Sequence, residues 1–158
     1  MGVELDALAL LDGGRMWTQG AWFDPVSGRM CLDGALEQAS GWNRHENFHR
    51  RGPVWALMGT PEYTAQYESY RAAHRRVRSA IQKLYRPKQH LGDVSITSWN
   101  DELSPSKFKK VKAVLLEAAR MALAELPPPP AVDPDPAPGN PPMSLDKHVQ
   151  ERELVSSS

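Results

Sequence analysis

Apolar residues recur at helical spacing in two short stretches near the start of the chain. Leu5, Leu8 and Leu11 predict a helix over residues 3–11, which Gly13 and Gly14 end. Residues 31–39 form the second stretch, with leucines and alanines on one face and a closing Ser-Gly pair. The pattern therefore predicts two short helices before residue 42.

The strongest periodicity lies in residues 60–86. Thr60 is a typical N-cap, and Pro61 suits the first helical position. The apolar stripe behind them advances in steps of four and three, which predicts a helix of about twenty-five residues that ends before Pro87. The members of the stripe are Tyr63, Tyr67, Tyr70, His74, Val77, Ile81 and Leu84.

A final helix is predicted from Ser104 and Pro105 onward. Its apolar residues keep three-four spacing as far as Leu126. Before it, residues 94–99 alternate briefly, which fits either a short strand or one turn of helix, and we expect Asn100 and Asp101 to break that element. Residues 42–60 have no clean period, and we interpret them as a loop with one helical turn around residues 54–58.

The segment between the first two helices predicts a small β-hairpin. Residues 17–23 are rich in aromatic side chains, residues 24–28 read as a turn with Pro25 and Gly28, and the chain then returns. The predicted fold is mainly α with this hairpin (α+β), containing three to four helices.

Proline dominates the end of the chain. Nine of the fourteen prolines fall in residues 127–142, where the missing backbone donors prevent a helix or an inner strand. We therefore expect one globular domain over residues 1–126, a disordered Pro-rich linker over 127–143, and a tail over 144–158 that forms at most a short helix.

The formal net charge of zero conceals a segregation of charge. Residues 1–41 carry a net −4, residues 42–126 a net +7, and residues 127–158 a net −3. A basic middle between acidic ends indicates an anionic partner, an acidic tail folded over the basic face, or an ordinary solvated surface. We favour the solvated surface, because neither end is a dense acidic block.

The single cysteine excludes an internal disulfide and a Cys-rich zinc site. The first residues carry Glu4 and Asp6, unlike the basic start of a signal peptide. The longest apolar run there is far too short to span a bilayer. We expect a soluble, cytoplasmic protein with no membrane partner.

One motif suggests metal-dependent catalysis. His45, Glu46 and His49 fit the H-E-x-x-H pattern, in which two histidines bind zinc and the glutamate acts as general base. Arg50 and Arg51 follow directly and would repel the cation. A zinc-dependent hydrolase is therefore an alternative and not the leading hypothesis.

Cys31 is a second catalytic candidate. It stands at a predicted helix N-terminus, which stabilises a thiolate, with Gln19 upstream and histidines downstream. Its flanking residues match no local signature of a cysteine enzyme. We favour a small, buried apolar role for it.

The long helix carries a basic face, with partner-binding candidates at Arg71, Arg75, Arg76, Arg78 and Lys83. Phosphate contacts along residues 71–88 would give nucleic-acid binding, and the alternative is a solvated face. We expect His74, on the apolar stripe, to be a core histidine. The final helix crowds lysines into its first turns, where the helix dipole disfavours them: Lys107, Lys109, Lys110 and Lys112.

Three short signatures give the chain a resemblance. They are Trp17-Thr-Gln19-Gly-Ala, Cys31-Leu-Asp-Gly-Ala-Leu and Trp99-Asn100-Asp101, and in the last we expect tryptophan to anchor the core and the polar side chains to bond local backbone. Together they resemble an uncharacterised family of small domains, a domain of unknown function, in actinobacteria and their phages. The resemblance implies the order of elements, an actinobacterial or phage origin and an accessory role. It carries over no catalytic or binding residue.

These observations favour a protein without catalytic activity and without a cofactor. We expect a cytoplasmic accessory protein, plausibly phage-encoded, that binds a host or viral macromolecule, with a protein as the first choice of partner and nucleic acid as the second. Zinc hydrolysis is the enzymatic alternative.

Overall fold

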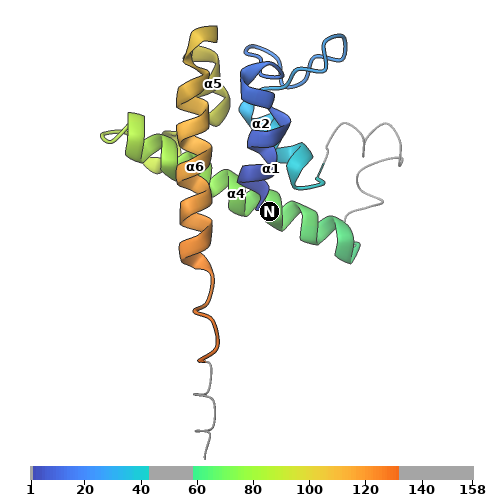
Figure 1. Ribbon diagram of the computed structural model, residues 1–158, viewed down its shortest axis with the longest axis vertical. Coiled ribbons are helices and arrows are strands. Elements are labelled where there is room, and N and C mark those ends of the chain that lie inside the picture. The colour runs from blue at the N-terminus through green and yellow to red at the C-terminus, as the bar shows by residue number, and fades with distance from the viewer. Residues whose placement is uncertain (1, 43–58, 132–158) are drawn as a thin grey trace, which may run out of the picture. The chain divides into compact units, whose positions relative to one another are not determined.

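The computed structural model describes residues 2–42 and 59–131, and in that part the protein is mainly helical (Figure 1). Among the described residues, short 3₁₀ turns at Asp12–Gly14, Leu91–Asp93 and Pro105–Lys107 connect the longer elements. The described α-helices are α1 (Val3–Leu10), α2 (Leu32–Ala39), α4 (Pro61–Tyr85), α5 (Ile96–Glu102) and α6 (Phe108–Glu125). No helix in the described part combines the length and apolar character needed to cross a membrane.

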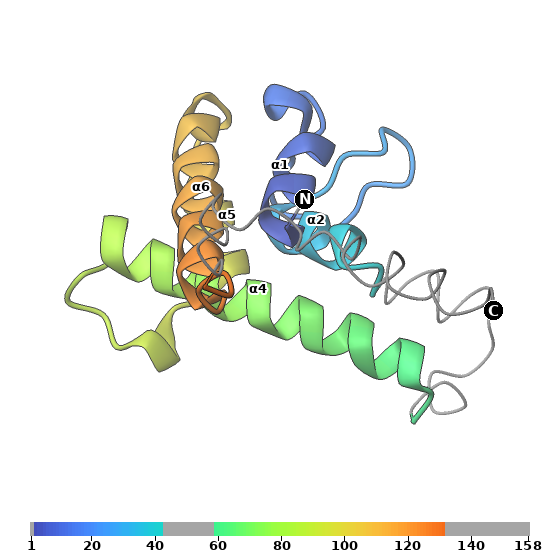
Figure 2. The same cartoon turned by 60° about the horizontal axis from the view of Figure 1, so that its bottom comes forward.

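The core lies where α4 crosses the other helices (Figure 2). Helix α1 packs against both α2 and α6, and α4 runs across α6 and α2. Each helix contributes fully buried apolar side chains, so that one cluster joins them. Its fully buried larger members include Leu11, Leu32, Leu36, Val77, Ile81, Ile96, Val111, Val114 and Leu115.

Helix α4 confirms its predicted start, end and length of 25 residues. Thr60 Oγ1 accepts a hydrogen bond from the Tyr63 amide at 3.3 Å, as the N-cap assignment requires. The predicted stripe is wrong at its far end, where Leu84 is 41% exposed. Steps of four and three average 3.5 residues per turn, so the stripe drifts around a helix of 3.6 and leaves the core.

A buried ion pair links the first, longest and last helices. Glu4 on α1 is 1% exposed, and its Oε1 accepts a hydrogen bond from Arg76 Nε at 2.6 Å. The same guanidinium binds Glu125 Oε2 at the end of α6 at 2.9 Å. A charge so deeply buried is tolerated only with such a partner, which fixes the three helices relative to one another.

The predicted β-hairpin is wrong. Within residues 2–42 and 59–131 there is no strand, only two isolated bridges from Met30, one to Trp17 and one to Phe23. Gly20 has φ +69°, a left-handed conformation that turns the chain in the middle of the expected first strand. The segment is therefore a loop, pinned by single hydrogen bonds such as Thr18 N to Met30 O at 3.0 Å.

The segment before the last helix takes the helical form of its two predicted alternatives, but the helix runs past its predicted end. It forms helix α5, capped by Ser95 Oγ, which accepts a hydrogen bond from Ser98 N at 3.2 Å. Asn100 and Asp101 lie inside this helix and do not break it. They are compatible with helix because their side chains bond groups far away in the sequence and do not compete for the local backbone.

Candidate functional site

The side chain of Asn100 is the centre of a buried hydrogen-bond network. Asn100 is fully buried, and its Oδ1 accepts from Trp17 Nε1 at 2.7 Å and from the Leu32 amide at 3.2 Å. Its Nδ2 donates to the Thr18 carbonyl at 3.1 Å. One amide side chain thus satisfies groups from the loop before α2 and from the start of α2 itself.

The neighbours of Asn100 tie down the same loop. Asp101 Oδ1 accepts from the Gly20 amide at 2.8 Å, and Gln19 Nε2 donates to the Leu103 carbonyl. The sequence signatures therefore meet in space, although we expected the polar side chains of Asn100 and Asp101 to bond local backbone. Trp99 has another role, because its ring stacks on Tyr85 of α4 with centroids 5.6 Å apart.

The network holds one end of a loop over residues 20–29, called here the 20–29 loop. The amide of Cys31, just after the loop, donates to the carbonyl of Trp22 within the loop at 3.1 Å. That carbonyl lies so close to α2 that a Cβ on Gly34 would be 2.4 Å from the oxygen. Glycine in the second signature thus permits the loop to pass directly over the first turn of α2.

The interior of the 20–29 loop is ordered by Asp24. Its Oδ1 accepts from the Val26 amide at 3.0 Å, and its Oδ2 accepts from the Ser27 hydroxyl. Backbone hydrogen bonds join Asp24 N to Arg29 O at 2.7 Å and Gly28 N to Asp24 O at 2.8 Å. The Ser27 hydrogen bond, assisted by the Val26 amide, lowers the pKa of Asp24, so the turn is held by an ionised carboxylate.

The tip of this ordered loop is apolar and open to solvent. Val26 is 94% exposed and Phe23 is 42% exposed. The loop projects from the helices in both views of the ribbon (Figures 1 and 2). The arrangement is a fixed turn that presents an apolar side chain outward.

Cys31 lies inside the fold. It is 1% exposed, and its Sγ accepts the Gly34 amide at 3.4 Å as the N-cap of α2. Burial raises the pKa of the Cys31 thiol, which is the opposite of the lowered value that an activated cysteine needs. The position supports the small buried role.

Most of the predicted partner-binding cations on α4 are engaged within the protein. Arg76 forms the ion pairs described above, and Arg78 donates to the carbonyls of Val94 at 2.8 Å and Gly92 at 2.9 Å. Lys83 binds Glu117 of α6 at 2.7 Å. Hydrogen bonds from Arg120 and Lys83 lower the pKa of Glu117 to about 2. These side chains fasten α4 to its neighbours.

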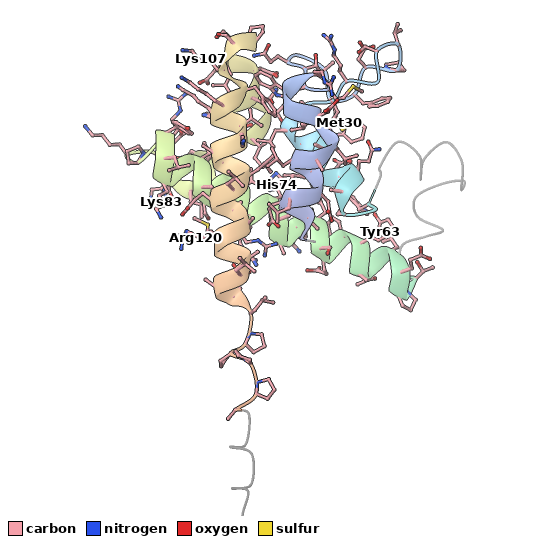
Figure 3. The ribbon with its side chains drawn as sticks, viewed as in Figure 1. Met30, Tyr63, His74, Lys83, Lys107 and Arg120 are labelled. Atoms are coloured by element: carbon pink, nitrogen blue, oxygen red, sulfur yellow. The ribbon has the colours of Figure 1, made fainter. Side chains whose placement is uncertain are left out.

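The remaining cations lie on the solvent-facing side of α4 and at the start of α6. Arg71 lies 3.9 Å from Glu68 and above the ring of Tyr67, and Arg75 is exposed. On α6, Lys110 Nζ lies 5.1 Å from the Tyr85 ring centroid, whereas Lys109 and Lys112 are exposed. Figure 3 shows Lys107 at the start of α6, whereas Lys83 lies near the end of α4. Lys88, Lys107, Lys109 and Lys112 are exposed, as is Lys83 in its ion pair with Glu117.

A polar cluster that the sequence did not reveal joins α2 to α4. Asp33 Oδ1 accepts from the Tyr70 hydroxyl at 2.9 Å and lies 3.9 Å from His74 Nε2. Burial lowers the pKa of His74, Asp33 opposes that shift, and Arg78 adds to it. His74 is therefore partly buried at the edge of the core, where its protonation state affects the contact between two helices.

The H-E-x-x-H motif lies outside the described residues, so the zinc ligands His45 and His49 and the base Glu46 stay a prediction. Within the described ranges, no three histidine, cysteine or acidic side chains are close enough together to hold a metal ion. The Pro-rich segment beyond residue 131 also lies outside the described ranges.

Comparison with known proteins gives one result. A protein-family model described as a family of unknown function (DUF6197) matches residues 5–121, which confirms the resemblance to an uncharacterised domain family. The comparisons with curated proteins and with solved structures found no match.

Proposed function

The chain belongs to DUF6197, a family of unknown function, and we propose that it is a binding protein that presents its 20–29 loop to a protein partner. The observation that carries this proposal is Val26, 94% exposed at the tip of a loop held at both ends and in its interior. The Val26 side chain contributes almost nothing to the stability of the fold, because it buries almost no apolar area within the protein.

Preorganisation supports a role in binding. A flexible loop loses conformational entropy when it binds, at about 0.5–1.5 kcal/mol for each side chain immobilised. In the 20–29 loop the Asp24 side chain and the Trp22 carbonyl already hold the backbone. The loop can therefore insert Val26 and Phe23 into an apolar pocket of a partner with little further ordering.

The placement of the signature residues supports the same conclusion. Trp17, Gln19, Asn100 and Asp101 are engaged in hydrogen bonds that fix the base of the loop, and Cys31 is buried. Side chains with this arrangement act as a support for the loop and offer no exposed nucleophile or acid–base pair. An accessory, phage-encoded role in an actinobacterial host, which the sequence resemblance implies, is part of this proposal, as is the cytoplasmic location expected from the first residues.

The proposal is tested by capture followed by reconstitution. The full chain, Val26→Asp and the matched control Leu123→Asp serve as baits, because Leu123 is also exposed, at 69%, but lies on α6. A protein captured by wild type and control is then purified, and its Kd is measured for each bait. We expect Val26→Asp to weaken binding at least about tenfold, which corresponds to 1.4 kcal/mol.

Two outcomes would contradict this proposal. Equal affinity of Val26→Asp and wild type for the purified partner would remove the loop from the interface. Loss of the partner only in a chain ending at Leu126 would assign binding to the C-terminal segment instead. Thermal melting of each variant is measured beforehand. Val26→Asp is expected to leave the midpoint unchanged, and Leu123→Asp to lower it slightly, because an acidic side chain in the last turn of α6 opposes the helix dipole.

A further inference from the structure

A cavity of about 250 Å³, called here the α4–α5 cavity, is formed by the end of α4, the loop that follows it and α5. The buried part of its lining is apolar, since Ile81, Val94 and Trp99 are each at most 4% exposed. The exposed part, its rim, is polar and consists of Arg86, Gln89, Asp93, Ser95, Ser98 and Glu102. We propose that this cavity binds a neutral, hydroxyl-rich small molecule of the size of a single sugar ring.

The loop that forms one wall of the α4–α5 cavity is held in place by side chains of α4. Arg78 donates to the Val94 carbonyl at 2.8 Å, and Gln82 Nε2 donates to the Gln89 carbonyl at 2.7 Å. Within the loop, Gln89 Nε2 donates to the Asp93 carbonyl at 2.9 Å. The wall is therefore formed before a ligand arrives, so binding requires little ordering of the loop.

Several polar groups of the rim are available to a ligand. Gln89 engages its Nε2 and Ser98 engages its backbone amide, which leaves the amide oxygen of the first and the hydroxyl of the second. Ser95 Oγ accepts from the Ser98 amide at 3.2 Å and keeps its own proton to donate. Among the described residues, no side chain binds the carboxylate of Asp93. Hydroxyl groups match this set, because each one can donate to a carboxylate or amide oxygen and accept from a serine.

The charges around the α4–α5 cavity cancel. Arg86 and Glu102 on its rim form an ion pair with each other. Arg78 binds the carbonyl of Val94, next to Asp93 in the chain, and so offsets the charge of the Asp93 carboxylate. Two guanidinium groups thus stand against two carboxylates, which favours a neutral ligand over a cation or an anion.

The volume of the cavity sets the size of its ligand. Cavities that hold drug-sized molecules measure about 300–1,000 Å³, so a volume of about 250 Å³ admits a smaller molecule. A monosaccharide has C–H groups on the faces of its ring and hydroxyl groups around the edge. The C–H groups suit the apolar lining, and the hydroxyl groups suit the polar rim.

The test titrates the isotope-labelled full chain with glucose, galactose, mannose and ribose, each up to about 50 mM, and follows the backbone amide signals by NMR. At least one of these sugars is expected to bind with a Kd of about 1 mM, because so small a ligand makes few contacts. The amide signals of Gln89, Asp93 and Ser98 are expected to shift. Those of the 20–29 loop, which does not line the cavity, are expected to stay in place.

Two substitutions in the rim are expected to weaken this binding. Asp93→Ala removes a charged acceptor and is expected to raise the Kd at least about tenfold. Ser98→Ala removes one hydroxyl and is expected to raise the Kd about threefold, while the amide that caps α5 stays in place. Thr97→Ala is the matched control with an unchanged Kd, because Thr97 is exposed on the same helix and does not line the cavity.

Three results would overturn the inference. They are absence of binding by all four sugars, equal affinity of Asp93→Ala and wild type for the sugar that binds, and signal shifts confined to residues outside 81–102. Glucosamine and glucuronate, which add a positive and a negative charge to the sugar ring, are titrated alongside. If either binds at least about tenfold more tightly than glucose with the same dependence on Asp93, the cavity takes a charged ligand and not a neutral one.

Discussion

Trp17 and Asn100 are 83 positions apart in the sequence, and the indole Nε1 of the first donates to the side-chain Oδ1 of the second across 2.7 Å. Both residues are buried, at 6% and 0% exposure. The same oxygen accepts the Leu32 amide, so one atom connects the loop, α2 and α5. The bond connects the first and last sequence signatures, because the first contains its donor, Trp17, and the last contains its acceptor, Asn100.

Asn100→Ala is expected to destabilise the protein by about 3 kcal/mol, because Trp17 Nε1, the Leu32 amide and the Thr18 carbonyl all lose their partner in a site closed to water. Urea unfolding measures the change. Thr97→Ala, at an exposed position of the same helix, is the control and is expected to change stability by less than about 0.5 kcal/mol. A stable Asn100→Ala protein would show that the network does not hold the loop.

Gly34→Ala is expected to destabilise the protein although alanine is the better helix former by about 1 kcal/mol. Its Cβ would lie 2.4 Å from the Trp22 carbonyl oxygen, which forces the 20–29 loop away from α2. Gly92→Ala is the matched control, because nothing lies within 4 Å of its Cβ position. Thermal melting compares the two, and equal midpoints would contradict the close contact.

Protonation of His74 is expected to weaken the fold. Burial lowers the pKa of His74 below its ordinary 6.5, so the folded protein binds the proton less tightly than the unfolded chain does. The histidine contribution is therefore complete above pH 6.5 and is lost as the pH falls below that value. Chemical unfolding at about pH 8 and about pH 5.5 is expected to show a smaller loss in His74→Gln than in wild type. The exposed His90→Gln is the control, and an unchanged pH dependence in His74→Gln would contradict the assignment.

The purified, untagged protein is expected to contain less than stoichiometric zinc. Arg50 and Arg51 directly follow His49 in the sequence and oppose binding of a cation there. Elemental analysis of wild type and His49→Ala decides the question. Stoichiometric zinc that disappears in His49→Ala would revive the hydrolase hypothesis and justify a search for substrates.

Residues at the helix boundaries were enough to predict where several of the helices begin and end. For α4, a capping threonine, a proline in the first turn and a proline after the end fixed both boundaries. The short helices α1 and α2 also match their predictions closely, because glycines or polar residues mark where each one ends. These features act within a few residues and so are visible in the sequence.

Long-range contacts decided what the sequence did not predict. Asn100 has the local preference of a helix breaker, yet it lies within α5 because its partners come from residues 17–32. The hairpin pattern failed because the side chain of Asp101 on α5 holds the Gly20 amide in a turn within the expected strand. For the cations of α4, carboxylates such as Glu4 and Glu117 lie on other helices, so the sequence could not distinguish an engaged arginine from an exposed one.

The double ion pair of Arg76 has a consequence for synthesis of the chain. Glu4 leaves the ribosome first, Arg76 follows, and Glu125 comes nearly at the end of the helical part. Until α6 is complete, the surface of α1 and α4 that packs on it stays uncovered. The helical unit is therefore expected to fold in one cooperative step after its last helix has been translated. A chain truncated before α6 is expected not to fold, because the surfaces of α1 and α4 that pack on α6 stay exposed.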